Sequence, residues 1–125
     1  MICADSGGSN GHTKMGWKYY LQQFATESGL KITVCHFPTG TSKWNKIEHR
    51  LFSFISENWR GKPLLNYEVV INYIRNTTTK TGLEVFARLD QKHYEKGIRF
   101  TKEQMNTVKL KRHDLFPDWN YTISP

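Results

Sequence analysis

Two acidic side chains in this sequence could act together on a divalent cation. Asp5 follows the short apolar run Met1 to Ala4 and precedes the loop "SGGSNG" at residues 6–11. A carboxylate that ends a strand, with small residues after it, is either a turn residue or a metal ligand at the mouth of a sheet. The residues and elements predicted around Asp5 indicate which of these two roles it has.

The second carboxylate, Glu48, lies in a segment with a strong helical pattern, residues 43–59. At about 100° per residue, Glu48 falls about 40° from Trp44, inside an arc of apolar side chains. A buried charge is costly without a partner, so we expect Glu48 to face the sheet near the ends of its strands. A position at the helix edge, with the carboxylate reaching solvent, is the alternative.

Two carboxylates that meet at the end of a sheet repel each other unless a cation lies between them. Oxygen ligands with room for water and phosphate suit Mg²⁺ or Mn²⁺. Asp5 and Glu48 are therefore candidate ligands for one of these ions, and a capping or ion-pair role for the two residues stays open.

The elements that would position Asp5 form a strand–helix–strand unit. Residues 1–4 are typical of a buried strand, and residues 30–35 of a second one. Between them, apolar residues at helical spacing predict a helix over 14–28 that ends at Gly29. The apolar positions are Trp17, Tyr20, Leu21 and Phe24. This order predicts an α/β fold with a parallel strand pair, and Asp5 then lies at the carboxyl end, where open α/β sheets bind ligands.

The remainder of the chain predicts further helices and short strands. Thr41 or Ser42 can cap the helix over 43–59, and a second helix spans about 67–75. Alternating apolar residues predict strands near 83–89, 98–100 and 119–123. Thr101 and Gln104 predict a capping box for a short helix through residue 108. The change of pattern near residue 80 predicts two parts, residues 1–80 and residues 81–125.

Composition narrows the class of protein. The net charge is +7, which favours a polyanionic partner, although charge alone does not exclude a protein that is merely basic. No apolar run approaches the roughly 18 residues of a membrane span, and no signal peptide begins the chain. We interpret Cys3 and Cys35 as reduced core thiols of a cytosolic protein.

Two other kinds of site are less favoured by the spacing of the residues. A zinc site made of Cys3, Cys35, His12 and His36 lacks the short paired spacings that such sites have. The glycine-rich loop at 6–11 stands where a phosphate loop of a nucleotide-binding module would stand. The phosphate loop of nucleotide-binding proteins ends in Gly-Lys-Ser or Gly-Lys-Thr, whereas this chain has His12 at the lysine position.

Three quoted stretches resemble a known family. "ICADSGGSNG", then "LKITVCHFPTGTSKWNKIEHRLFSFISENWRGKPL" and then "TTTKTGL" resemble the C-terminal part of the ISAzo-type (Rhodopirellula-type) insertion-sequence transposases. The resemblance runs over essentially the whole chain, through "RHDLFPDWNYTI". It implies a ribonuclease-H-like fold of the D-D-E group, with a small β-containing C-terminal extension, and a DNA transposase that cleaves and transfers strands at the ends of an insertion sequence.

The resemblance also assigns roles to residues. Asp5 corresponds to the second aspartate of the D-D-E set and Glu48 to the glutamate, which together would bind Mg²⁺ or Mn²⁺. Asn45 matches the Asn-x-x-Glu element also seen in mariner-like transposases. Supporting positions near the site or the DNA would be Gly7, Gly8, Asn10, His36 and Lys43. The implied partners are transposon ends and target DNA, and the implied location is the bacterial cytoplasm, in association with the nucleoid.

One member of the D-D-E set has no counterpart, since no strand with the first aspartate precedes Asp5. We therefore expect a C-terminal fragment that is inactive alone, unless another chain supplies the missing part. The alternative is a non-catalytic remnant that binds DNA or associates with itself. We also expect residues 1–4 to form a sheet edge that pairs with another copy, or with the segment around 119–123.

Overall fold

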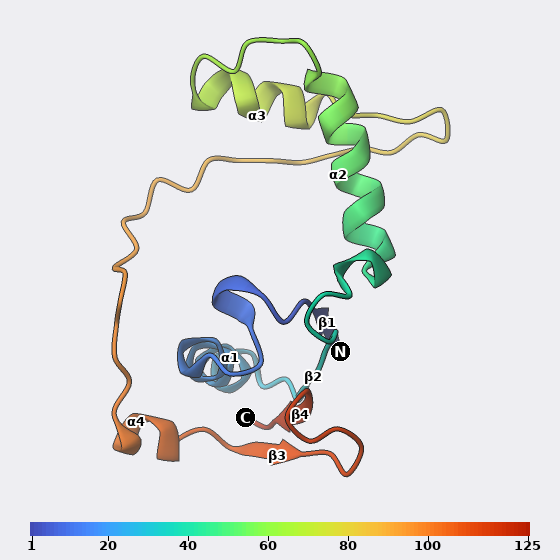
Figure 1. Cartoon of the computed structure of the whole chain (residues 1–125). Helices are drawn as coiled ribbons and strands as arrows, with labels where there is room; N and C mark the ends of the chain where they lie inside the picture. Colours follow the sequence, from blue (N-terminus) through green and yellow to red (C-terminus); the bar gives the residue numbers. More distant parts are fainter. The chain divides into compact units, whose positions relative to one another are not determined.

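The computed structural model covers residues 1–125 and describes all of them apart from the side chain of Ser42. The chain divides into two compact units (Figure 1). Unit 1 comprises Met1–Asn45 and Glu95–Pro125, and unit 2 comprises Lys46–Tyr94. The C-terminal segment thus belongs to the same unit as the N-terminal one, and the predicted boundary near residue 80 stays a prediction.

Unit 1 contains a four-stranded mixed sheet, which confirms the α/β class. Its strands are β1 (Ile2–Ala4), β2 (Ile32–His36), β3 (Leu110–Arg112) and β4 (Asn120–Ile123), in the order β1-β2-β4-β3. β1 and β2 are parallel, whereas β4 is antiparallel to both β2 and β3. Helix α1 (Met15–Ser28) connects the parallel pair, as the strand–helix–strand pattern predicts.

β1 lies at one edge of this sheet, as expected from the sequence. The alternative in which residues 119–123 cover that edge is wrong, because β4 pairs with β2 on its other side. Strand β2 has backbone N–H and C=O groups along both of its edges. β1 pairs with one edge, and the antiparallel β4 pairs with the other.

The core of unit 1 lies between the sheet and α1. Val34, Tyr121 and Ile123 are fully buried on the two central strands, and Leu21 and Ala25 cover them from the helix. The predicted helix face is only partly right, because Tyr20 and Phe24 remain about half exposed. The face turned to the sheet is instead the one that carries the small Ala25 and the anchored Gln22 described next.

Two hydrogen bonds fix the rotation of α1 about its axis. The side chain of Gln22 donates to the carbonyl oxygen of Ser124 (2.8 Å) and accepts from the backbone N–H of Lys109 (2.8 Å). The buried side-chain amide of Gln22 thus satisfies backbone groups just before β3 and just after β4, which ties α1 to the C-terminal β segment. Gly29 ends the helix in the left-handed conformation (φ 69°), as the sequence predicts.

At the C-terminal end, the structure confirms some of the predicted elements and not others. Helix α4 (Lys102–Asn106) begins with the capping box of Thr101 and Gln104, and β4 forms where residues 119–123 alternate. The strands predicted near 83–89 and 98–100 are wrong, since neither segment pairs with a strand among the described residues. Leu83, Val85 and Ala87 are still more buried than the residues between them, so the alternation reflects one-sided packing without a ladder.

Unit 2 contains helices α2 (Lys46–Trp59) and α3 (Tyr67–Arg75), close to their predicted bounds. Asn66 caps α3 by accepting from the backbone N–H of Val69 (2.9 Å). In α2 only Ile55 is fully buried; Leu51, Phe54 and Trp59 are half-buried and Ile47 is 84% exposed, so the apolar arc is covered only in part within this unit. α2 contacts α3 near its C-terminal end, where the side-chain amide of Asn58 donates to the carbonyl oxygen of Tyr73.

A 3₁₀ turn, η2 (Ser42–Trp44), precedes α2. The predicted cap at Ser42 concerns a side chain outside the described residues. The hydroxyl of Thr41 donates to the carbonyl oxygen of Pro38 (2.6 Å), so it closes the preceding turn. Cys3 and Cys35 are free, as predicted, although Cys3 is exposed and is therefore no core thiol.

Candidate functional site

Asp5 lies at the carboxyl edge of the parallel strand pair. It directly follows β1, and Ala4 is in register with His36, the last residue of β2. The backbone N–H of Phe37 donates to the carbonyl oxygen of Ala4 (2.8 Å), and the hydroxyl of Ser6 donates to that of Phe37. The chain on either side of Asp5 is therefore tied to the end of β2, which holds the carboxylate at this edge.

His36 also fixes the backbone of Asp5. Its Nδ1 lies 3.3 Å from the carbonyl oxygen of Asp5, and its Nε2 lies 2.9 Å from the hydroxyl of Tyr121. A carbonyl can only accept, so Nδ1 carries the proton and Nε2 of the neutral ring accepts from the hydroxyl. The indole Nε1–H of Trp17 donates to the same hydroxyl (2.9 Å). One hydrogen-bonded chain thus runs from Trp17 through Tyr121 and His36 to Asp5, and we call it the Tyr121 relay.

Burial keeps the groups of the relay neutral. It lowers the pKa of His36, and the hydrogen bond to the Asp5 carbonyl opposes this shift only in part. It raises the pKa of Tyr121 to about 12, again against an opposing hydrogen bond, from Trp17. His36 therefore acts here as a neutral hydrogen-bonding residue that orients the backbone, which agrees with the plain role expected of a lone histidine.

Two buried polar atoms in the same region lack a hydrogen-bond partner among the described residues. They are Oδ1 of Asp5 and Nδ1 of His12. A buried carboxylate oxygen without a donor is costly, and a bound cation removes that cost. The environment of Asp5 thus fits an oxygen-preferring divalent ion. No group of three His, Cys, Asp or Glu side chains suited to a metal occurs in the part of the chain that the structure describes.

The loop after β1 depends on glycine at two positions. Gly8 begins the 3₁₀ turn η1 (Gly8–Asn10) with φ 64°, a conformation that favours glycine. At Gly11, an added Cβ would lie 2.8 Å from the backbone oxygen of Ser6, too close for any side chain. Sequence reasoning missed Gly11, whose only signal was its place at the end of the loop. Around Gly7 no atom lies within 4 Å of such a Cβ, so its predicted role in leaving space for a phosphate stays a prediction.

The other predicted site residues lie on the segment that leads into α2. Lys43 is exposed in η2, Asn45 is half-buried, and Glu48 is exposed in the first turn of α2. Asn45 and Glu48 each have an interaction partner. Glu48 belongs to unit 2 and Asp5 to unit 1, so their action as a metal-binding pair stays a prediction. The exposure of Glu48 matches the helix-edge alternative within its own unit.

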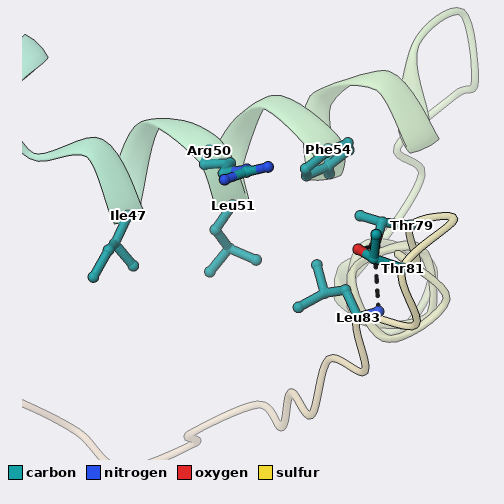
Figure 2. Close-up of a pocket in the computed structure, with 7 residues that line it drawn as sticks. All are labelled: Ile47, Arg50, Leu51, Phe54, Thr79, Thr81 and Leu83. Atoms are coloured by element: carbon teal, nitrogen blue, oxygen red, sulfur yellow. Dashed lines mark hydrogen bonds between the residues drawn. The ribbon is translucent and has the colours of Figure 1, made fainter.

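A pocket of about 430 Å³ lies within unit 2 (Figure 2). Ile47, Leu51 and Phe54 line it from α2, and Leu83 lines it from the segment after α3. Figure 2 shows the side chains of Ile47, Leu51 and Leu83 around one space, with Thr79 bound to the backbone N–H of Leu83 (3.3 Å). Arg50 is the only charged residue of the lining, so this pocket offers no acid–base pair and no carboxylate for a metal.

The residues that sequence reasoning missed are Tyr121 and Trp17 as supports of Asp5. The sequence pattern predicts Tyr121 only as a strand residue and Trp17 only as part of a helix face. A polar aromatic residue in a core usually finds a hydrogen-bond partner, and this was the one available signal. It does not say which partner, because Tyr121 lies 85 positions from His36 in the chain.

Comparison with known proteins identifies a family that matches the chain. A family model described as Rhodopirellula transposase DDE domain matches residues 1–125, which confirms the resemblance found in the sequence. No curated protein and no solved structure matches the chain. Within the described residues, none of the helices has the length and apolar character that crossing a bilayer requires.

Proposed function

The chain belongs to the Rhodopirellula transposase DDE domain family, and from this premise we propose that it forms part of the catalytic domain of a metal-dependent DNA transposase. The reaction is strand cleavage and strand transfer at the ends of an insertion sequence. The domain is ribonuclease-H-like, with β1, α1 and β2 as its central parallel unit and the C-terminal β segment as an extension.

In this proposal Asp5 and Glu48 are the carboxylates that hold Mg²⁺ or Mn²⁺. The single observation that supports it best is the buried Oδ1 of Asp5, which has no hydrogen-bond donor among the described residues and lies at the carboxyl end of the parallel pair. When bound, the ions activate the attacking oxygen and stabilise the leaving one. The remaining carboxylate of the D-D-E set then comes from outside these 125 residues.

The protein's own groups have positioning roles in this scheme. The hydroxyl of Ser6 donates to the carbonyl oxygen of Phe37, and Nδ1 of His36 bonds to the carbonyl oxygen of Asp5. These two hydrogen bonds hold the backbone next to the Asp5 carboxylate. A carboxylate on a fixed backbone loses less freedom when it binds an ion, which raises its affinity. Asn45, one turn before Glu48, supports the glutamate. The positive net charge of +7 supports DNA as the partner.

The test is Mn²⁺ binding by the whole chain, measured by electron paramagnetic resonance of the free ion. We expect weak binding that Asp5→Asn abolishes and Glu48→Gln weakens. Asp114→Asn is the matched control, because Asp114 is an exposed aspartate on the C-terminal segment. Equal affinity in wild type and Asp5→Asn would contradict the assignment of Asp5. An unchanged affinity in Glu48→Gln alone would remove Glu48 from the site.

A cleavage assay tests the need for a further carboxylate. With Mn²⁺ and transposon-end DNA, we expect the purified 125-residue chain to show little or no cleavage. Two carboxylates provide too few ligands to place both ions of a two-metal site. Robust metal-dependent cleavage that Glu48→Gln abolishes would contradict this expectation.

A further inference from the structure

A wide groove in unit 1 opens beside the loop that follows Asp5. Its volume is about 970 Å³, and it runs between this loop, the start of α1 and the segment 97–100. Three hydroxyl groups line it, those of Ser6, Ser9 and Thr13, together with the cations Lys14 and Arg99. The groove thus combines a segment from each end of the chain.

The charge of the lining has one sign. Lys14 and Arg99 are exposed, and within the part of the chain that the structure describes neither forms a salt bridge. By contrast, Arg112 pairs with Asp118 at 2.7 Å. No acidic side chain is among the lining residues. Two unpaired cations on one groove attract an anion more strongly than scattered surface charges do, because low-dielectric walls focus their field.

The segment 97–100, which carries Arg99, packs against α1 through the side chain of Phe100. The Phe100 ring lies 5.2 Å from the ring of Tyr19 and 5.9 Å from that of Tyr20, between centroids. The absence of a side chain at Gly16 permits this approach, since an added Cβ would lie 3.0 Å from Phe100. The packing of Phe100 therefore keeps Arg99 on the groove.

We propose that this groove binds the phosphate backbone of DNA, with Lys14 and Arg99 as its cationic contacts. This inference rests on the proposed function, which makes DNA the partner, and it assigns a surface to that partner. Lysine and arginine release condensed counterions when they meet phosphates, and the hydroxyl groups of Ser9 and Thr13 can donate to phosphate oxygens, whereas that of Ser6 already donates to Phe37. Neither contact reads base edges, so this groove contributes affinity and no sequence preference.

The proposal also gives the C-terminal segment a function. Arg99 lies 85 positions after Lys14, and only the packing of Phe100 on α1 brings the two cations to one groove. The negative charge of Asp5, which directly precedes Ser6, opposes a phosphate at this end until a cation is bound. A metal ion bound at Asp5 would therefore change the affinity for DNA. Binding is measured in EDTA, so that the affinity reports the contribution of Lys14 and Arg99 without metal.

The experiment is fluorescence anisotropy with a labelled 20-base-pair duplex of mixed sequence, titrated at several salt concentrations. Lys14→Gln and Arg99→Gln should each weaken binding about 3- to 10-fold and reduce the slope of log affinity against log salt by about 1. Both side chains are exposed, so neither change should alter the circular dichroism spectrum.

Lys31→Gln is the matched control. It removes the same charge from an exposed lysine of unit 1, just beyond the opposite end of α1. At about 1.5 Å per residue, the ends of α1 lie about 20 Å apart, beyond the reach of the groove. We expect Lys31→Gln to change the affinity less than about twofold, in line with its distance from the groove.

The outcomes separate this proposal from the proposed function. If wild type binds DNA and the Lys14 and Arg99 variants behave as Lys31→Gln does, the groove is wrong while DNA remains the partner. If wild type does not bind the duplex even at low salt, both the groove and the DNA partner are overturned. Titration with ATP is the remaining arm, and tight ATP binding lost in Lys14→Gln would assign the groove to a nucleotide and overturn the DNA assignment.

Discussion

Replacing Tyr121 by phenylalanine removes one hydroxyl group from the relay that supports Asp5. The Tyr121 side chain is fully buried, and its hydroxyl satisfies both Nε1 of Trp17 and Nε2 of His36, each at 2.9 Å. Phenylalanine fills nearly the same volume, so the change creates almost no cavity. The change does leave Nε1 of Trp17 and Nε2 of His36 without the hydroxyl to which both are hydrogen-bonded.

The size of the effect follows from the burial of these two atoms. His36 is 6% exposed, so its Nε2 stays without a donor at a cost of about 1–3 kcal/mol. Trp17 is only partly buried, and water can replace part of its lost bond, which reduces its share to about 0.5–1.5 kcal/mol. We therefore expect Tyr121→Phe to lower the free energy of unfolding by about 2–4 kcal/mol. In a unit of this size, that lowers Tm by at least about 8 °C.

Urea unfolding followed by circular dichroism measures this loss. Tyr20→Phe is the matched control, because Tyr20 is about half exposed and the same atom is removed. A double-mutant cycle with Trp17→Phe should give a coupling energy of about 0.5–3 kcal/mol, since the two residues share one hydrogen bond. If Tyr121→Phe costs less than about 0.5 kcal/mol, as an ordinary surface change does, the relay does not stabilise this end of the sheet.

The remaining predictions concern titration, packing and a helix cap. The tyrosine absorbance should show one group with a pKa near 12 instead of 10, and this group should be absent in Tyr121→Phe. Between pH 10 and about 12 the folded state keeps the proton of Tyr121 whereas the unfolded state loses it. The free energy of unfolding should therefore fall as pH rises through this range. Gly16→Val should displace Phe100 and speed trypsin cleavage in the segment before it, whereas Gly7→Ala, with open space around it, should not. Asn66→Ala should cost unit 2 about 1 kcal/mol in urea unfolding, and Asn66→Asp should retain most of it, since aspartate also caps helices.

Features that depend on neighbouring residues along the chain could be predicted from the sequence. Gly29 ends α1 because glycine adopts the left-handed conformation at little cost, and Thr101 with Gln104 starts α4 because their side chains bond to backbone N–H groups within one turn. The strand–helix–strand order placed Asp5 at the carboxyl end of a parallel pair, because a crossover helix of this length permits that arrangement. The family resemblance, too, rests on residues that are continuous in sequence.

Contacts between segments that are distant in the chain could not be predicted from the sequence. The alternation at 83–89 is as regular as that at 119–123, yet only the second segment becomes a strand, since only it finds the open edge of β2. The same pairing buries Tyr121 beside His36, and the packing of Phe100 on α1 brings Arg99 to the groove that Lys14 lines. Hydrogen bonds between strands and contacts between side chains join residues far apart in the chain, and local periodicity carries no information about which of them will be neighbours.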